Sequence, residues 1–228
     1  VFFTGADGSM RSNRAFSQAA GLYACDLFIG STLQIDLQGN SSTATVDRIA
    51  GFGGAPNMGS DPHGRRHSSF AYNKAGKEAV DGKVIKVRKL VVQLVETYRE
   101  HMHPVFVEEL DAWQLQDKMG SDFPPIMIYG EDVTHIVTEE GIANLLLCRS
   151  AEEREQAIRG VAGYTPIGMQ RDHAKVEELR QRGIIQRPED LGIDTSKATR
   201  DLLAAQSVKD LVKWSEGLYS PPSRFRNW

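Results

Sequence analysis

The chain has 228 residues, a formal net charge of −3 and an ordinary composition, with 40% hydrophobic and 25% charged residues. This length allows a substantial core, the charge gives no global attraction to nucleic acid, and no apolar run approaches the ~18 residues of a membrane span. The first residues lack an initiating Met and the features of a signal peptide, so we expect a fragment of a longer chain. Cys25 and Cys148 lie far apart in apolar surroundings, which is typical of reduced, buried thiols in a cytoplasmic protein.

The first half of the chain is predicted to form strands and loops after one helix. Residues 12–24 place Ala15, Phe16, Ala19, Ala20 and Tyr23 at the spacing of an amphipathic helix. Apolar residues then fall almost entirely on odd positions over 27–37, which predicts a strand. Gln38, Gly39 and Asn40 form a predicted turn. Further strands are expected over residues 83–96, 104–109, 126–129 and 133–137.

From about residue 138 the pattern becomes helical. We expect a helix that follows a Thr138 cap and contains Ile142, Leu145 and Leu146. Ser150 and Glu153 have the spacing of a capping box, in which each side chain bonds the other residue's backbone N–H. Helices are also predicted over residues 169–182 and 207–216, ended by Gly183 and Gly217. Strands interleaved with helices indicate an α/β fold or an open-sheet α+β fold.

A glycine-rich stretch, "IAGFGGAPNMGSDPHGRRH" from Ile49 to His67, is the first candidate site. Its glycines would let backbone amides approach a phosphate or the oxyanion of a thioester. The stretch does not fit G-x-G-x-x-G, because Pro56 stands in the place of the last glycine, and no P-loop follows. Arg65 and Arg66 would suit a phosphorylated ligand or an acidic carrier protein. The alternatives are a plain mobile connection and a solvated charge cluster.

Three further groups of residues have two interpretations each. Arg11 and Arg14, at the N-terminus of the predicted helix, suit a carboxylate substrate, or else Ser12 or Asn13 is simply an N-cap. The hydroxyls of residues 39–43 either cap a turn or line a site. Glu139 and Glu140 either supply a carboxylate nucleophile or favour the N-terminus of a helix. His101 and His103 lack further ligands at matching spacing, so we expect surface histidines, and no Gly-x-Ser-x-Gly elbow is present.

Longer stretches resemble a known family. "DLFIGSTLQIDLQGNSSTATVDRIAGFGGAPNMGSD" and "THIVTEEGIANLL" resemble segments of family I CoA-transferases. "GSMRSNRAFSQAAGLYACDLFIGSTLQID", "GFGGAPNMGSDPHGRRHSS", "AGYTPIG" and "LYSPPSRFRNW" look like the malonate decarboxylase alpha-subunit family. The resemblance covers essentially the whole chain. It implies an α/β fold with an open mixed sheet flanked by helices. It also implies a single CoA-transferase-like domain over 1–228, helical from about residue 138, with a docking tail over 218–228.

The resemblance also implies an activity. Such a subunit exchanges acetyl for malonyl on the thiol of an acyl carrier protein, and other subunits then decarboxylate the malonyl thioester. The thiol belongs to a phosphoribosyl-dephospho-CoA group on the carrier, so the enzyme itself binds no cofactor or metal directly. By this resemblance Gly53, Gly54 and Ala55 line the thioester. Substrate binding is expected at Arg11, Asn13, Asn40 and Asn57, and contact with the CoA-like arm at Arg65 and Arg66.

One feature of the family I enzymes, the nucleophilic glutamate, has no counterpart here. These enzymes use a glutamate located before the glycine loop, but between Val1 and Gly51 the only acidic residues are Asp7, Asp26, Asp36 and Asp47. Either the nucleophile lies N-terminal to this sequence or the transfer is not covalent, and the fragment alone is expected to be inactive. The alternatives are a citrate-lyase-like alpha subunit, a general CoA-transferase, and a non-catalytic assembly domain that uses the tail with Phe225 and Trp228.

Overall fold

A computed structural model describes residues 27–49, 90–122, 124–125 and 127–221. It divides the chain into two compact units, Val1–Ile185 and Gln186–Trp228, each of which is described by itself. The expectation of one domain over the whole chain therefore stays a prediction. None of the helices in the described part is both long enough and apolar enough to cross a membrane.

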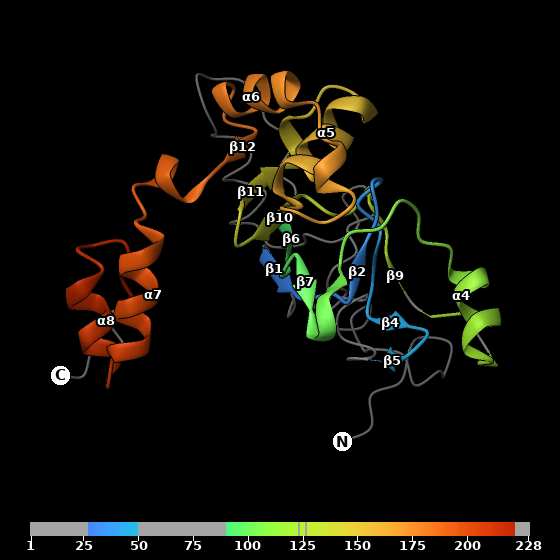
Figure 1. The fold of residues 1–228 in the computed structure, drawn as a ribbon, viewed down its shortest axis with the longest axis horizontal. Coiled ribbons are helices and arrows are strands. Elements are labelled where there is room, and N and C mark those ends of the chain that lie inside the picture. Colours follow the sequence, from blue (N-terminus) through green and yellow to red (C-terminus); the bar gives the residue numbers. More distant parts are fainter. Residues whose placement is uncertain (1–26, 50–89, 123, 126, 222–228) are drawn as a thin grey trace, which may run out of the picture. The chain divides into compact units, whose positions relative to one another are not determined.

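The first unit is built on a five-stranded mixed sheet (Figure 1). Its order is β1-β6-β10-β11-β12, in which β1 runs parallel to β6, β6 parallel to β10, and β10 antiparallel to β11. The strands are β1 (Leu27–Gly30), β6 (Leu90–Leu94), β10 (His135–Thr138), β11 (Gly141–Asn144) and β12 (Ile185–Gln186). The open mixed sheet with helices confirms the predicted fold class.

Shorter strands form three small sheets beside the main one. One has the order β2-β3-β9, and the others pair β4 with β5 and β7 with β8. Their bounds are β2 (Gln34–Ile35), β3 (Ser41–Ser42), β4 (Ala44–Thr45), β5 (Arg48–Ile49), β7 (Tyr98–Arg99), β8 (His103–Pro104) and β9 (Met127–Ile128).

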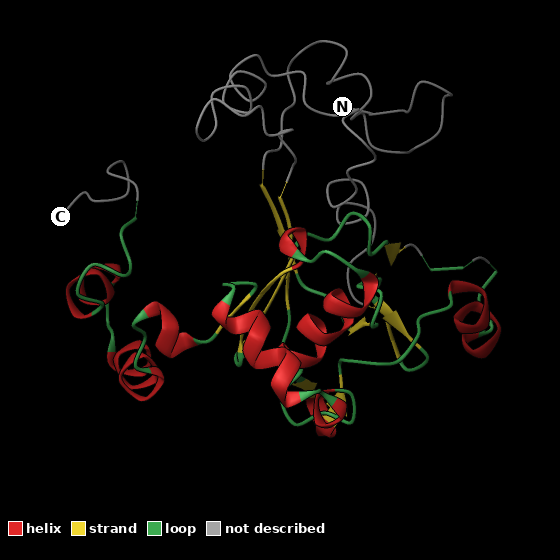
Figure 2. Ribbon diagram, turned by 90° about the horizontal axis from the view of Figure 1, so that it is seen from above, coloured by secondary structure: helices red, strands yellow, loops and turns green. Residues whose placement is uncertain are grey.

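Helices α5 (Ala151–Val161) and α6 (His173–Gln181) belong to the first unit, together with α4 (Ala112–Met119). In Figure 2, seen from above, red helices pass over the strands of the sheet. Ala157, Ile158 and Val161 of α5 are fully buried and share one core with Val91 and Ile136 of the sheet. The second unit contains α7 (Thr195–Ala204) and α8 (Val208–Trp214). Short 3-10 helices span Glu100–Met102, Leu145–Leu147, Gly168–Gln170 and Pro188–Leu191.

Several predicted elements are confirmed. The turn at 38–40 forms with Gly39 at a φ of 85°, and strands occur within 83–96, 126–129 and 133–137. Ser150 caps α5 by accepting the Glu153 backbone N–H at 3.1 Å. The Glu153 carboxylate, however, bonds the N–H of Arg149 at 2.8 Å rather than that of Ser150. Gly183 follows α6, as expected, and α8 (Val208–Trp214), capped by Ser207, lies within the helix predicted over 207–216.

The predicted helix after Thr138 is wrong. Glu139 and Glu140 form the two-residue turn of a hairpin in which Thr138 pairs with Gly141. The apolar residues that suggested a helix lie on β11 and on the 3-10 helix Leu145–Leu147. The first α-helix after residue 138 therefore begins at Ala151.

Three other predicted elements need correction. The strand over 27–37 is two strands, because Thr32 and Leu33 bond the Ser42 carbonyl and lead the chain into another sheet. The strand predicted over 104–109 does not form as one element. Pro104 belongs to β8, and Phe106 makes a single bridge to Ile35. The helix over 169–182 is a 3-10 turn followed by α6, which starts at an Asp172 cap. The predicted helix over 12–24 lies outside the described residues.

Candidate functional site

A buried carboxylate organises the turn between β2 and β3. The Asp36 side chain is fully buried. It accepts the backbone N–H of Gln38 at 3.0 Å, that of Asn40 at 2.8 Å, and that of Leu110 at 3.0 Å. The Asn40 side-chain amide donates a fourth bond at 2.8 Å. Because one carboxylate satisfies donors from three residues, it fixes both the turn and the chain that leads into α4.

Asn40 links this turn to a second segment. Its Oδ1 atom accepts the backbone N–H of Gly130 at 2.8 Å. A Cβ on Gly130 would lie 2.0 Å from the Gln38 carbonyl oxygen, so this close approach requires glycine. From α5, the Arg154 guanidinium donates to the carbonyl oxygens of Gln38 at 3.2 Å, of Val133 at 3.1 Å, and of Gly130. The Asp36 carboxylate, the Asn40 amide and the Arg154 guanidinium thus all hold the turn between β2 and β3.

A cavity of about 340 Å³ lies beside this turn. Its lining residues are Gln34, Thr45, Val46, Asp47, Arg99, Val107, Glu109, Leu110, Asp111, Gln114, Leu115 and Lys118. Gln34 lies four residues after the end of β1, and Arg99 lies five residues after the end of β6. Ligands of open α/β sheets bind beyond the carboxyl ends of parallel strands, and this cavity is lined by residues that follow two such ends.

Arg99 is the least exposed cation of the cavity, with 13% of its side chain accessible. Its Nη1 and Nη2 atoms contact the Asp47 carboxylate at 3.3 and 3.2 Å. Its Nε atom is buried and has no acceptor among the described residues. The bonds from Arg99, and then that from the Thr45 hydroxyl, hold the pKa of Asp47 well below its usual range. Asp47 therefore stays ionised and keeps the guanidinium in place.

Two other acids near the parallel strand ends are also engaged. The Asp111 side chain caps α4 by accepting the N–H groups of Trp113 and Gln114 at 2.8 and 3.1 Å. The Glu139 carboxylate accepts the Thr97 backbone N–H at 3.1 Å and the Thr97 hydroxyl. Glu139 thus fastens the β10–β11 turn to the chain after β6, in place of the predicted helix N-terminus.

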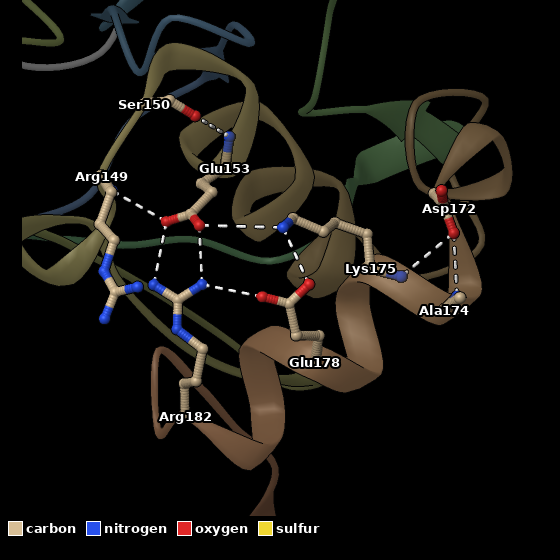
Figure 3. A network of polar contacts seen from close by, with 8 residues as sticks. All are labelled: Arg149, Ser150, Glu153, Asp172, Ala174, Lys175, Glu178 and Arg182. Atoms are coloured by element: carbon tan, nitrogen blue, oxygen red, sulfur yellow. Dashed lines mark hydrogen bonds and ion pairs between the residues drawn. The ribbon is translucent and has the colours of Figure 1, made fainter.

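A cluster of charged side chains joins α5 to α6 (Figure 3). Glu153 of α5 contacts Arg182 at 2.7 Å and Lys175 at 3.8 Å. Glu178 of α6 contacts the same two cations at 3.0 and 2.9 Å. The bond from Arg182, followed by that from the Arg149 N–H, lowers the pKa of Glu153 to about 2. Both Glu153 and Glu178 are paired with cations, so the cluster fits a structural role in which it stabilises the packing of α5 against α6.

No group of three or more His, Cys, Asp or Glu residues in the described part could hold a metal ion. Most predicted site residues lie outside the described part, namely Arg11, Asn13, Gly53, Gly54, Ala55, Asn57, Arg65 and Arg66. Asn40 is described, and its amide makes the two contacts given above. Its role in substrate binding stays a prediction.

Sequence reasoning missed Asp36, Arg99 and the cavity. The spacing of Asp36 before Gly39 and Asn40 is an available signal, because Asp side chains bond backbone N–H groups two residues on. No local pattern marks Arg99, since its partner Asp47 is 52 residues away in sequence.

Comparisons with known proteins agree with this architecture. A family model described as "Malonate decarboxylase, alpha subunit, transporter" matches residues 1–228. An acetyl-S-ACP:malonate ACP transferase from Malonomonas rubra is 60% identical over 233 residues, covering 100% of this chain and 42% of that protein. The chain therefore spans less than half the length of this relative.

Two solved structures are similar as well. One is a Pseudomonas malonate decarboxylase hetero-tetramer in complex with malonate, at 55% identity and a TM-score of 0.69, covering 100% of this chain and 41% of that one. The other is a malonate decarboxylase alpha subunit from Acinetobacter baumannii, at 53% identity and a TM-score of 0.69. The match covers 97% of this chain and 42% of that one. The sequence match and the shared fold together show that this chain belongs to the malonate decarboxylase alpha-subunit family.

Proposed function

We propose that this chain is part of a transferase that exchanges acetyl for malonyl on a carrier-protein thiol. In this reaction acetyl-[carrier] and malonate give malonyl-[carrier] and acetate. The observation that carries the proposal is the 60% identity, over the whole chain, to an acetyl-S-ACP:malonate ACP transferase. Because the chain spans 42% of that relative, the activity belongs to the whole protein.

The partners follow from the same reaction. An acyl carrier protein brings the thioester on a phosphoribosyl-dephospho-CoA arm, and decarboxylase subunits consume the malonyl product in the cytoplasm. A multisubunit assembly is supported by the similar Pseudomonas protein, which is a hetero-tetramer. In this arrangement Gly53, Gly54 and Ala55 line the thioester, and Arg65 and Arg66 contact the phosphorylated arm.

The cavity beside the Asp36 turn is the place proposed for the substrate carboxylate. Arg99 and Lys118 supply its cations. Two of its acids, Asp47 and Asp111, already bond Arg99 and the start of α4. The β4–β5 hairpin lines the cavity with Thr45 and Asp47 and ends at Ile49, from which the chain continues into the glycine-rich stretch.

The exchange reaction can be tested directly in the full-length protein. Acetyl-carrier is incubated with malonate or with citrate, and the acyl group on the carrier is identified by intact mass spectrometry. We expect malonyl-carrier from malonate and no exchange with citrate. Gly54→Val should abolish the exchange, because its side chain would occupy the approach of the thioester. Exchange with citrate alone, or a fully active Gly54→Val protein, would contradict the proposal.

A second experiment tests the substrate pocket. Arg99→Met should raise the KM for malonate by about tenfold or more, since a charge-assisted bond to a carboxylate is lost. Arg48→Met is the matched control, because Arg48 lies on the adjacent β5, is 44% exposed in its side chain and pairs with Glu100 at the surface. Equal KM values for the two variants would remove Arg99 from the pocket.

A further inference from the structure

Five charged side chains line the cavity of about 340 Å³, namely Asp47, Arg99, Glu109, Asp111 and Lys118. Arg99 and Asp47 bond each other at 3.2 and 3.3 Å. The Asp111 carboxylate accepts two backbone N–H groups at the start of α4. The side chains of Glu109 and Lys118 form no ion pair with another residue of the described part. These two side chains therefore keep their charges for a ligand of the cavity.

Lys118 is held at the cavity by contacts that do not involve its own charge. The chain that leads into α4 is fixed where the Leu110 N–H donates to the Asp36 carboxylate at 3.0 Å. Further along the helix, Leu115 is buried in a small apolar cluster with Ala44 of β4. Lys118 lies three residues after Leu115, and residues at this spacing are neighbours on a helix surface. The structure thus sets the position of this ammonium group before any ligand binds.

Arg99 and Lys118 come from different elements and offer different donors. Both Nη atoms of Arg99, on β7, are engaged with Asp47, and its buried Nε atom has no acceptor among the described residues. The Lys118 ammonium carries three N–H donors. Acetate has one carboxylate and can use one cation, whereas malonate has two carboxylates and can use both. A second cation therefore favours malonate over acetate.

We propose that Lys118 is a specificity-determining residue, which binds the carboxylate that malonate has and acetate lacks. This rests on the proposed function, because it names the residue by which that site distinguishes the incoming acid from the outgoing one. Arg99 holds the other carboxylate through its Nε atom. Glu109 lines the same cavity and repels both carboxylates, so its charge weakens the binding of malonate.

The experiment compares two acids in the full-length protein. Acetyl-carrier is incubated with malonate or with ¹³C-labelled acetate, and intact mass spectrometry follows the acyl group on the carrier. The quantity of interest is the ratio of kcat/KM for malonate to kcat/KM for acetate. Lys118→Met should lower this ratio at least tenfold, because a charge-assisted bond to the second carboxylate is lost. Lys118→Arg keeps a cation and should retain the ratio to within about threefold.

Two further variants complete the experiment. Lys209→Met is the matched control, because it removes an exposed lysine of α8 that does not line the cavity, and its ratio should equal that of the parent. Glu109→Gln should lower the KM for malonate about threefold or more, since a repelling charge is removed. Circular dichroism compares the fold of all four variants with that of the parent.

The outcomes separate this inference from the proposed function. A parent protein that does not exchange malonate contradicts the proposed function, and the role of Lys118 falls with it. A parent that exchanges malonate, together with an unchanged ratio in Lys118→Met, overturns the role of Lys118 alone. An equal loss of both exchanges in Lys118→Met would overturn it as well, because a merely structural residue has that effect. An unchanged or higher KM in Glu109→Gln would show that malonate binds elsewhere.

Discussion

Replacing Asp36 is the most direct test of how the turn beside the cavity is held. Asp36→Ala removes the acceptor of four N–H donors, three from the backbone and one from the Asn40 amide. A hydrogen bond to a charged group contributes about 1.5–3 kcal/mol, and a buried donor left unpaired costs about 1–3 kcal/mol. Because the contributions of bonds that share one acceptor group are not additive, we expect a loss of about 3–5 kcal/mol in the free energy of unfolding rather than the full sum.

Asp36→Asn removes the charge of the side chain and two of its acceptor positions while it keeps the side-chain volume nearly constant. The carboxamide keeps the volume, but its NH₂ group faces two of the four donors, so we expect about half the loss, roughly 2 kcal/mol. Asp117→Ala is the matched control, because Asp117 is exposed on α4, and its effect should stay within about 0.5 kcal/mol. Urea unfolding followed by circular dichroism measures all three variants, with equal m-values as a check on two-state behaviour. An Asp36→Ala protein within about 1 kcal/mol of the parent would refute the reasoning.

Three further predictions concern other groups. Gln93→Leu should raise the free energy of unfolding by about 1–2 kcal/mol, because both polar atoms of this buried side chain lack partners among the described residues; a less stable variant in urea unfolding would show that the amide has a partner. Arg182 and the Arg149 N–H lower the folded-state pKa of Glu153 from 4.5 to about 2, so its contribution to stability is present above 4.5 and is lost as the pH falls toward 2. The urea midpoint of Glu153→Gln should therefore fall less steeply than that of the parent across this window, and parallel curves would contradict this. Arg65→Ala combined with Arg66→Ala should weaken binding of the carrier with its prosthetic group by about tenfold, and that of the carrier without it much less; equal weakening in calorimetry would indicate a general charge patch.

Features decided within a few residues of sequence were predicted well. Ser150 and Ser207 cap helices because a side-chain oxygen two or three residues away is the nearest acceptor for the first free N–H groups. Gly39 and Gly183 mark chain reversals because each adopts a positive φ. The family resemblance rested on stretches of similar local sequence, and the matching family model confirmed it.

Predictions from local patterns were wrong where the same residues suited two kinds of secondary structure. Glu139, Glu140 and the apolar residues after them fit a capped helix as well as a hairpin. The hairpin forms because β10 already lies beside β6 in the sheet and offers β11 a partner of matching register. Such pairing is a property of the assembled sheet, which no window of sequence contains.

The fold class, the family and the main caps and turns could be predicted from the sequence, because these depend on periodicity and on contacts between near neighbours. Only the tertiary structure brought Asp36 to Leu110, 74 residues away, and Arg99 to Asp47, 52 residues away. These pairs follow from the order of the strands, because the strand order brings segments that are distant in sequence close together in space.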